Sequence, residues 1–158
     1  MRFGIGYDTH RFTNGDHVMI GGVRIPHSKG IEAHSDGDVL IHAIIDAILG
    51  ACGLGDIGTH YPDNDDLFKN ADSRHLLKKT NNLIASYKFL VHNIDATIIA
   101  EQPKISPFCK DIRGTIAVDL DIPTSFVNIK GTTNEKMGFI GRGEGIAAFA
   151  ICSLKEIS

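Results

Sequence analysis

Residues 34–50 read HSDGDVLIHAIIDAILG, and we expect the fold to be organised around this stretch. Almost every position from 39 to 49 is apolar, which predicts a helix that lies in the core of the protein. Ser35 is the predicted N-cap, and Asp38 three residues later can complete a capping box. Asp38, His42 and Asp46 follow one another at intervals of four residues, so they share one face of this otherwise apolar helix.

This row of polar side chains needs partners if the helix is buried, because an unpaired polar group in a protein interior costs free energy. In one interpretation His42 is a core histidine that is hydrogen-bonded to Asp46 or Asp38. In the other, the row binds a cation. The helix alone leaves both interpretations open.

The chain of 158 residues is predicted to form a single domain over 1–158, which can bury roughly 68–70% of the surface exposed by the unfolded chain. Apolar residues make up 42% and charged residues 22%, and no apolar run approaches the length of a membrane span. The first ten residues, MRFGIGYDTH, are typical of a strand and not of a signal peptide, so we expect a cytoplasmic protein. The net charge of -3, with scattered basic residues, argues against nucleic-acid binding.

The order of the predicted elements indicates an α/β fold. Strands are expected at 2–12, 89–100, about 126–132 and 143–156, a hairpin at 18–26, and helices at 35–50, about 73–86 and about 106–119. This order predicts a two-layer sandwich with a four-stranded main sheet, helices on one face and a small accessory hairpin. The last strand is apolar toward both faces of the sheet, which predicts that a partner subunit covers the second face.

A pair of metal-ligand residues stands on the first predicted strand. The period of two puts Asp8 and His10 on one face, where they offer a carboxylate oxygen and an imidazole nitrogen side by side. His42 can join them if the buried helix packs on this strand. Three protein ligands with a fourth position free are typical of a catalytic zinc site.

Other residues are suited to binding phosphate. Lys104 stands close to the start of a predicted helix, an end that favours anions, although a solvated lysine is the alternative. A strand then ends in side chains that suit a phosphate and its counter-ion, namely Thr132, Thr133, Asn134 and Glu135. Two cation sites together indicate phosphoryl transfer.

Two further stretches are expected to be loops. Residues 55–73 are polar and rich in aspartate, which is typical either of a functional lid or of a solvated acidic loop. Residues 138–145 are rich in glycine, but the spacing differs from that of a Walker loop or a dinucleotide fingerprint. We interpret the second stretch as a tight connection between strands.

The chain closely resembles the family of 2-C-methyl-D-erythritol 2,4-cyclodiphosphate synthases over nearly its whole length. The resemblance rests on GYDTH at 6–10, IGGVRIP at 20–26, AHSDGDVLIHAIIDAILG at 33–50, GDIGTHYPDND at 55–65, ADSR at 71–74, AEQPK at 100–104 and TTNEKMGFIGRGEGIA at 132–147. It implies a homotrimer that cyclises 4-diphosphocytidyl-2-C-methyl-D-erythritol 2-phosphate and releases CMP in non-mevalonate isoprenoid biosynthesis. Asn134 departs from the pattern, in which a third threonine is common.

The resemblance also implies which residues hold the metal ions and the phosphates. Zinc would be held by Asp8, His10 and His42, and a second divalent cation, Mg²⁺ or Mn²⁺, by Glu135. The implied catalytic residues are His34 and Thr133, which together with Ser35 would steady phosphate oxygens. Asp46 is the carboxylate that we expect to orient the zinc-bound imidazole of His42.

The remaining implied residues bind the other parts of the substrate or a regulator. The zinc ligands Asp8 and His10 would themselves contact the substrate, and the erythritol hydroxyls would meet Asp56, Ile57, Gly58, Tyr61, Asp63 and Asp65. The cytidine and the α-phosphate would lie against Ala100, Lys104, Ile105, Ser106, Thr132 and Asn134. An isoprenoid diphosphate could occupy an axial cavity of the trimer, lined by Phe139 and Arg142.

Two other functions fit the same residue spacing. A hydrolase could use the zinc ion to activate water, with the acidic loop beside it. A non-catalytic trimer could bind isoprenoid diphosphates, with zinc as a structural ion. The product formed from the cytidyl substrate distinguishes these functions from cyclisation.

Overall fold

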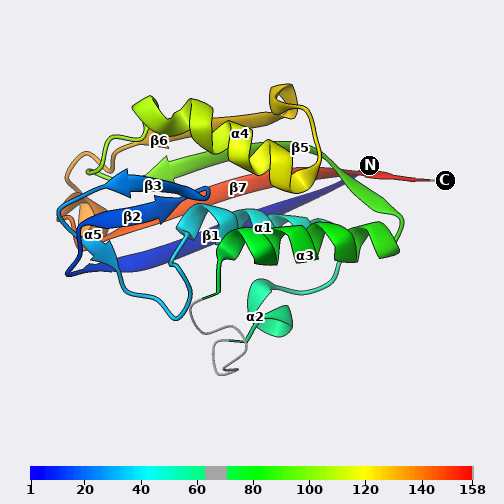
Figure 1. Ribbon diagram of the computed structural model, residues 1–158, viewed down its shortest axis with the longest axis horizontal. Helices are drawn as coiled ribbons and strands as arrows, with labels where there is room; N and C mark the ends of the chain where they lie inside the picture. Colours follow the sequence, from blue (N-terminus) through cyan, green and yellow to red (C-terminus); the bar gives the residue numbers. More distant parts are fainter. Residues whose placement is uncertain (63–70, 158) are drawn as a thin grey trace.

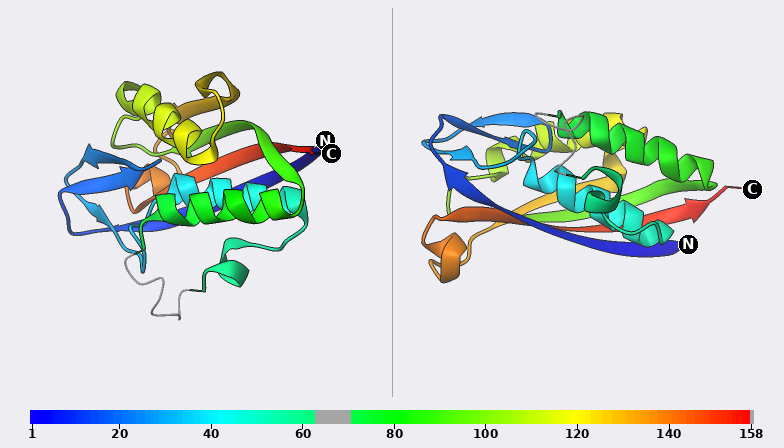
Figure 2. Two further views of the ribbon diagram at one scale, coloured as in Figure 1. Left: turned by 45° about the vertical axis from the view of Figure 1, so that its right-hand side comes forward. Right: turned by 90° about the horizontal axis from the view of Figure 1, so that it is seen from below.

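The computed structural model describes residues 1–62 and 71–157, which form a sheet covered on one face by helices (Figure 1). The sheet has the order β4-β1-β7-β5-β6. Its strands are β1 (Arg2–Thr13), β4 (Gly30–Ile31), β5 (Phe89–Ile99), β6 (Val127–Thr132) and β7 (Gly145–Glu156). The long helices are α1 (Val39–Cys52), α3 (Ser73–Ser86) and α4 (Cys109–Leu120), which lie on the same side of the sheet in Figure 2.

The predicted two-layer α/β fold is therefore confirmed, but the predicted count of four strands in the main sheet is wrong. The fifth strand, β4, has only two residues and pairs with the end of β1, with Phe12 opposite Ile31. Two residues are too few to give a readable period in the sequence. The accessory hairpin forms as expected from β2 (His17–Ile20) and β3 (Val23–Pro26).

The shorter elements differ from the prediction in two places. The helix expected over about 106–119 is divided into a 3-10 turn, η2 (Ser106–Phe108), and α4. The polar stretch 55–73, expected to be a loop, contains one helical turn, α2 (Ile57–His60). Two other short segments are η3 (Thr124–Phe126) and α5 (Gly138–Gly141). Among the described residues, no helix is both long enough and apolar enough to cross a membrane.

Helix α1 is the buried centre of the fold, as its apolar sequence predicts, and it lies directly against β1. The contact is close because Gly4 and Gly6 of β1 have no side chains. A Cβ atom built on Gly6 would lie only 1.9 Å from the carbonyl oxygen of Ala43 in α1. This close packing fixes His42, near the start of α1, over Asp8 of β1.

The N-cap of α1 is Asp38 and not Ser35, which corrects the predicted capping box. The Asp38 carboxylate accepts a hydrogen bond from the amide of Ile41 at 3.0 Å. It also accepts bonds from the amides of Gly21 at 2.9 Å and Gly22 at 2.7 Å, in the turn of the β2–β3 hairpin. The hairpin thus supplies partners that only the folded chain brings to Asp38, and these partners make its burial possible.

The sheet face away from the helices exposes a row of apolar side chains. In the last strand the inward residues, from Ile146 to Cys152 at every second position, are buried as predicted. Five large apolar side chains that point outward from β1 and β7 are between 45% and 68% exposed in this single chain: Phe3, Ile5, Tyr7, Phe149 and Ile151. Tyr7 and Phe149 are cross-strand partners whose ring centroids are 4.7 Å apart. We call these five residues the apolar sheet face.

Candidate metal centre and active site

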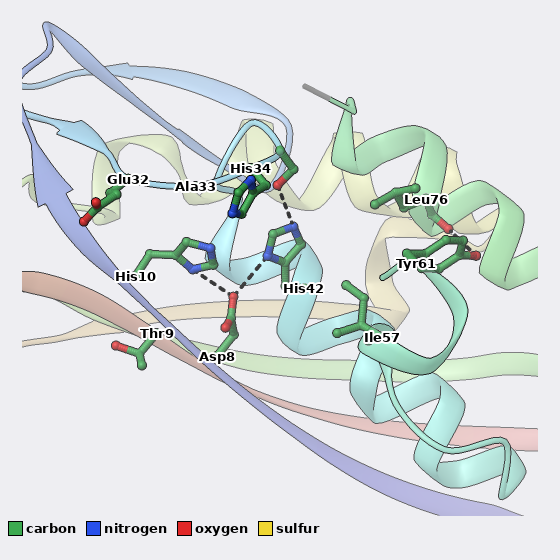
Figure 3. Close-up of a pocket in the computed structure, with 12 residues that line it drawn as sticks. Asp8, Thr9, His10, Glu32, Ala33, His34, His42, Ile57, Tyr61 and Leu76 are labelled. Carbon is green, nitrogen blue, oxygen red and sulfur yellow. Dashed lines mark hydrogen bonds and ion pairs between the residues drawn. The ribbon is translucent and has the colours of Figure 1, made fainter. Parts of the chain in front are cut away.

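Three side chains meet where α1 crosses β1, as the sequence predicts. Asp8 Oδ2 lies 3.0 Å from Nδ1 of His10 and 3.1 Å from Nδ1 of His42 (Figure 3). One ligand atom from each of the three residues lies within 4.8 Å of the other two. Two imidazole nitrogens and a carboxylate oxygen therefore point at a common position from two different elements.

The donor set suits a divalent metal ion, and one orphaned atom supports this assignment. Among the described residues, the buried Nδ1 atom of His10 has no hydrogen-bond partner of good geometry, although it approaches Asp8 closely. A buried nitrogen without such a partner costs free energy, and a metal ion would satisfy its lone pair. Nitrogen and oxygen ligands in this combination are typical of zinc.

The electrostatics of the three residues favour a charged carboxylate. Burial alone would raise the pKa of Asp8, but the two neighbouring imidazoles outweigh burial and lower this pKa to about 2. For His42, burial disfavours the protonated ring, but the hydrogen bond to Asp8 raises the pKa above its ordinary value. The carboxylate of Asp8 therefore stays ionised and ready to bind a cation over the physiological pH range.

The structure corrects the expected partner of His42. Its Nε2 atom lies 2.9 Å from Ser73 Oγ and 3.4 Å from Ser35 Oγ. Asp46 instead accepts a hydrogen bond from the amide of Ile57 at 2.7 Å, so it holds α2 against α1. Asp46 therefore does not orient the imidazole within the described residues, and the interpretation of His42 as a core histidine bonded to an aspartate of its own helix is wrong. The residue spacing within α1 indicates only possible partners on that helix, whereas Ser73 contacts the imidazole of His42 from α3.

A cavity of about 360 Å³ opens in front of the three residues. We call it the metal cavity. In addition to the three metal-site residues, its wall contains five residues for which substrate contacts were predicted: His34, Ser35, Ile57, Gly58 and Tyr61 (Figure 3). Sequence reasoning missed Thr9, Glu32, Ala33 and Leu76, which also line it. Glu32 and Ala33 directly precede His34, whereas Leu76 gave no signal beyond the apolar stripe of its helix.

Other predicted residues of the loop lie differently. Asp56 is the N-cap of α2, and its Oδ1 atom accepts hydrogen bonds from both the amide and the hydroxyl of Thr59 at 2.8 Å. These bonds lower the pKa of Asp56, and it is not among the residues that line the metal cavity. Asp63 and Asp65 lie outside the described residues.

The residues predicted to bind cytidine gather at the ends of two parallel strands. Strands β5 and β6 pair with Ile99 opposite Thr132, so the segments that follow them lie together. They line a second hollow of about 180 Å³, which we call the strand-end pocket and which contains Ala100, Lys104, Ile105, Ser106, Thr132 and Thr133. Among the described residues, the strand-end pocket shares no lining residue with the metal cavity.

The turn after β6 holds the remaining phosphate candidates. Asn134 donates its amide N–H to Glu101 at 2.9 Å and its side-chain Nδ2 to the carbonyl of Met137 at 2.9 Å. Glu135 accepts a hydrogen bond from the hydroxyl of Thr133 at 3.1 Å. Neither Asn134 nor Glu135 is among the residues that line either hollow.

Within the part of the chain that the structure describes, Phe139 and Arg142 line different hollows. Phe139 lines a depression next to His10, whereas Arg142 lines a different hollow with Phe12. Arg142 is paired with Glu144, with 2.6 Å between Nε and Oε1. A cavity that contains both residues would need more than one copy of the chain.

Comparison with known proteins supports the resemblance to the cyclodiphosphate synthases over nearly the whole chain. Residues 1–155 match the sequence model of the YgbB family. Over 154 residues the chain is 54% identical to the 2-C-methyl-D-erythritol 2,4-cyclodiphosphate synthase of Chromohalobacter salexigens, which covers 98% of this chain and 95% of the relative. The corresponding synthase of Pseudomonas putida is 55% identical, with 98% of both chains covered.

Solved structures share the fold. The bifunctional IspDF of Campylobacter jejuni matches 99% of this chain with a TM-score of 0.95 and 44% identity, and this chain spans 42% of that longer chain. IspF of Plasmodium falciparum in its CDP complex matches 99% of this chain and 97% of its own, with a TM-score of 0.87 and 37% identity. The agreement of sequence and fold over nearly every residue shows that the chain belongs to the YgbB family.

Proposed function

We propose that this chain is a 2-C-methyl-D-erythritol 2,4-cyclodiphosphate synthase of non-mevalonate isoprenoid biosynthesis. It converts 4-diphosphocytidyl-2-C-methyl-D-erythritol 2-phosphate into 2-C-methyl-D-erythritol 2,4-cyclodiphosphate and CMP. The observation that carries the proposal is the convergence of Asp8, His10 and His42 at the wall of the metal cavity, in a chain whose relatives bear this name.

The reaction asks the protein mainly to position the substrate and to balance charge. An oxygen of the 2-phosphate attacks the β-phosphorus, a new P–O bond forms, and the bond from the β-phosphorus to the bridging oxygen breaks. CMP leaves with that oxygen and its electron pair. The nucleophile is tethered and already ionised, so holding both phosphates in line replaces a bimolecular encounter.

The metal cavity is the place where the diphosphate would bind. Zinc is the ion that Asp8, His10 and His42 would hold, and when bound it supplies positive charge beside a phosphate oxygen. His34 and Ser35 line the same wall and would donate hydrogen bonds to the phosphates. Glu135 would hold a second divalent cation, Mg²⁺ or Mn²⁺, because hard cations prefer oxygen ligands.

The strand-end pocket would hold the CMP part of the substrate. Lys104 is the basic residue of its wall, and Thr133 would reach the phosphates from it. The CDP complex of the Plasmodium falciparum relative supports a cytidine nucleotide as the ligand. The erythritol would lie between the two hollows, against Asp56, Ile57, Gly58, Tyr61, Asp63 and Asp65.

A homotrimer would unite the two hollows, since they are separate in one chain. The strand-end pocket of one subunit would face the metal cavity of its neighbour. The apolar sheet face supports this assembly, because such a row of exposed apolar side chains is typical of an interface. Around the trimer axis Phe139 and Arg142 would line a cavity able to hold an isoprenoid diphosphate. We also propose that the enzyme works in the cytoplasm.

Phosphorus-31 NMR of the products tests the proposed reaction. The enzyme is incubated with the cytidyl substrate, zinc and magnesium, and we expect a cyclic diphosphate together with one equivalent of CMP. A linear product with a free terminal phosphate would identify a hydrolase. Absence of any turnover by the zinc-loaded enzyme would favour a binding protein.

Substitution of a metal-site residue tests which site is responsible. We expect His42→Ala to reduce CMP release by roughly a thousandfold, because losing several kcal/mol of transition-state stabilisation has this effect. His92→Ala is the matched control, since His92 lies on β5 and does not line the metal cavity. Full activity of the His42→Ala variant would reject the metal cavity as the active site.

A further inference from the structure

We propose that Asp36 and Ser73 form a hydrogen-bond relay that fixes the tautomer of His42 and thereby presents its Nδ1 lone pair to the metal ion. Neither residue has a role in the function proposed above, and the inference rests on the metal site of that proposal. In this account both are positioning residues, which act on the metal ion only through His42.

The relay begins at the first residue of α3. Ser73 is fully buried, and its hydroxyl lies between the carboxylate of Asp36 and Nε2 of His42, which is 2.9 Å away. The backbone amide of Ser73 donates to the second oxygen of Asp36 at 3.0 Å. Asp36 is therefore held on Ser73 by both of its oxygens, and it also accepts a bond from the amide of Asp38 at 3.2 Å.

The direction of each bond follows from the chemistry of the groups. An ionised carboxylate can only accept hydrogen bonds, so the single hydroxyl hydrogen of Ser73 points at Asp36. The Ser73 oxygen is then left as an acceptor toward His42. In the zinc-loaded enzyme the proton of the neutral imidazole must therefore be on Nε2, and Nδ1 carries the lone pair.

This tautomer is the one that a metal site needs here. Nδ1 of His42 is the atom that lies 3.1 Å from Asp8 Oδ2, at the position where the three ligands converge. A proton on Nδ1 would point at the metal ion and block the bond. A histidine ligand is commonly fixed in this way by a partner on its other nitrogen.

Ser35 is the competing partner of the same nitrogen, but its geometry is weaker. Its Oγ atom lies 3.4 Å from Nε2, near the limit of a hydrogen bond, and accepts a bond from the amide of Gly37 at 3.2 Å. Ser73 is closer by half an ångström and is not among the residues that line the metal cavity. Its removal therefore tests the relay without removing a residue that lines that cavity.

Zinc affinity and histidine NMR of the whole enzyme test the relay. In zinc-loaded, ¹⁵N-labelled protein we expect the His42 ring to carry its proton on Nε2, with slow exchange against water. Ser73→Ala should speed that exchange and weaken zinc binding by roughly 10- to 100-fold. Excess zinc should restore turnover by the Ser73→Ala variant, since the substrate contacts are intact. Asp36→Asn should weaken zinc binding in the same direction.

A matched serine on the same helix is the control. Ser86→Ala, in the exposed last turn of α3, should leave both the zinc affinity and the His42 signal unchanged. The relay is rejected if Ser73→Ala melts at the wild-type temperature and also binds zinc with wild-type affinity. It is rejected as well if the His42 proton of the zinc-loaded wild-type enzyme is on Nδ1.

The test separates the relay from the function proposed above. Failure of the wild-type enzyme to bind zinc would reject the metal site. The exchange of the His42 Nε2 proton with water can then be compared between the metal-free wild type and Ser73→Ala, and faster exchange in the variant would still support the relay. If the wild-type enzyme binds zinc more tightly than Ser73→Ala but forms no cyclic product, the proposed reaction is rejected and the relay is supported.

Discussion

The metal cavity and the strand-end pocket differ in how completely one chain builds them. The ligands of the metal cavity stand on β1 and α1, which are held together by the closest backbone contact between sheet and helix described above. The strand-end pocket lies at the ends of β5 and β6, and the two hollows share no lining residue among the described ones. A single chain therefore brings together all three candidate metal ligands but only half of the proposed active site.

The largest effect expected from this contrast comes from preventing assembly of the proposed trimer. Ile151→Asp places a charge in the apolar sheet face, and burying it at an interface would cost several kcal/mol. We expect a monomer that still binds zinc but has lost at least about 100-fold in turnover, since two or more kcal/mol of positioning would be lost. Sedimentation velocity and CMP release measure the two effects.

Val118→Asp is the matched control for this prediction. Val118 is also an exposed apolar residue, at 72%, but it lies on α4 and not on the apolar sheet face. This variant should assemble and react like the wild type. A monomeric Ile151→Asp enzyme with full activity would show that one chain suffices and would remove the contrast between the two hollows.

A smaller effect is expected within the strand-end pocket. Lys104→Met removes the basic group but keeps an unbranched side chain, and a hydrogen bond to a charged group contributes about 1.5–3 kcal/mol. We expect KM for the cytidyl substrate to rise by roughly 10- to 100-fold, with unchanged zinc affinity. A loss of zinc binding in this variant would contradict the separation of the two hollows.

The smallest effect concerns the stability of the metal-free protein in acid. The pKa of Asp8 is lowered from 3.8 to about 2, so its contribution is fully present above pH 3.8 and is lost as the pH falls through about 2. This contribution is of the order of 2 kcal/mol. Urea unfolding at a series of pH values should show that decline in the wild type and a shallower one in Asp8→Asn. Equal slopes for the two proteins would contradict the close pairing of Asp8 with the imidazoles.

The metal ligands could be predicted from the sequence because their placement depends on local periodicity. A period of two aligns Asp8 with His10, and the apolar sequence of α1 requires it to pack on a strand. Lys104 and residues 132–135 could likewise be singled out as phosphate candidates, because they follow two predicted strands. That these two strands are parallel neighbours, which brings the segments into one pocket, was not predicted. The roles of individual residues in catalysis came from the family resemblance.

The partners of buried polar groups could not be predicted, because they come from distant parts of the chain. Asp38 caps α1 only because the turn at Gly21 and Gly22 delivers two amides to it. Ser73 meets His42 only because α3 packs beside α1. Asp46, which we expected to orient His42, instead accepts a hydrogen bond from the amide of Ile57 in α2. No spacing within one helix carries this information.

The most direct measurement is a zinc-edge anomalous difference map of crystals of the zinc-loaded enzyme. The account predicts a single strong peak about 2.0–2.2 Å from a carboxylate oxygen of Asp8, a nitrogen of His10 and Nδ1 of His42. A peak elsewhere would contradict the account. So would a map without a peak, in which the three side chains are hydrogen-bonded to one another and no ion lies between them.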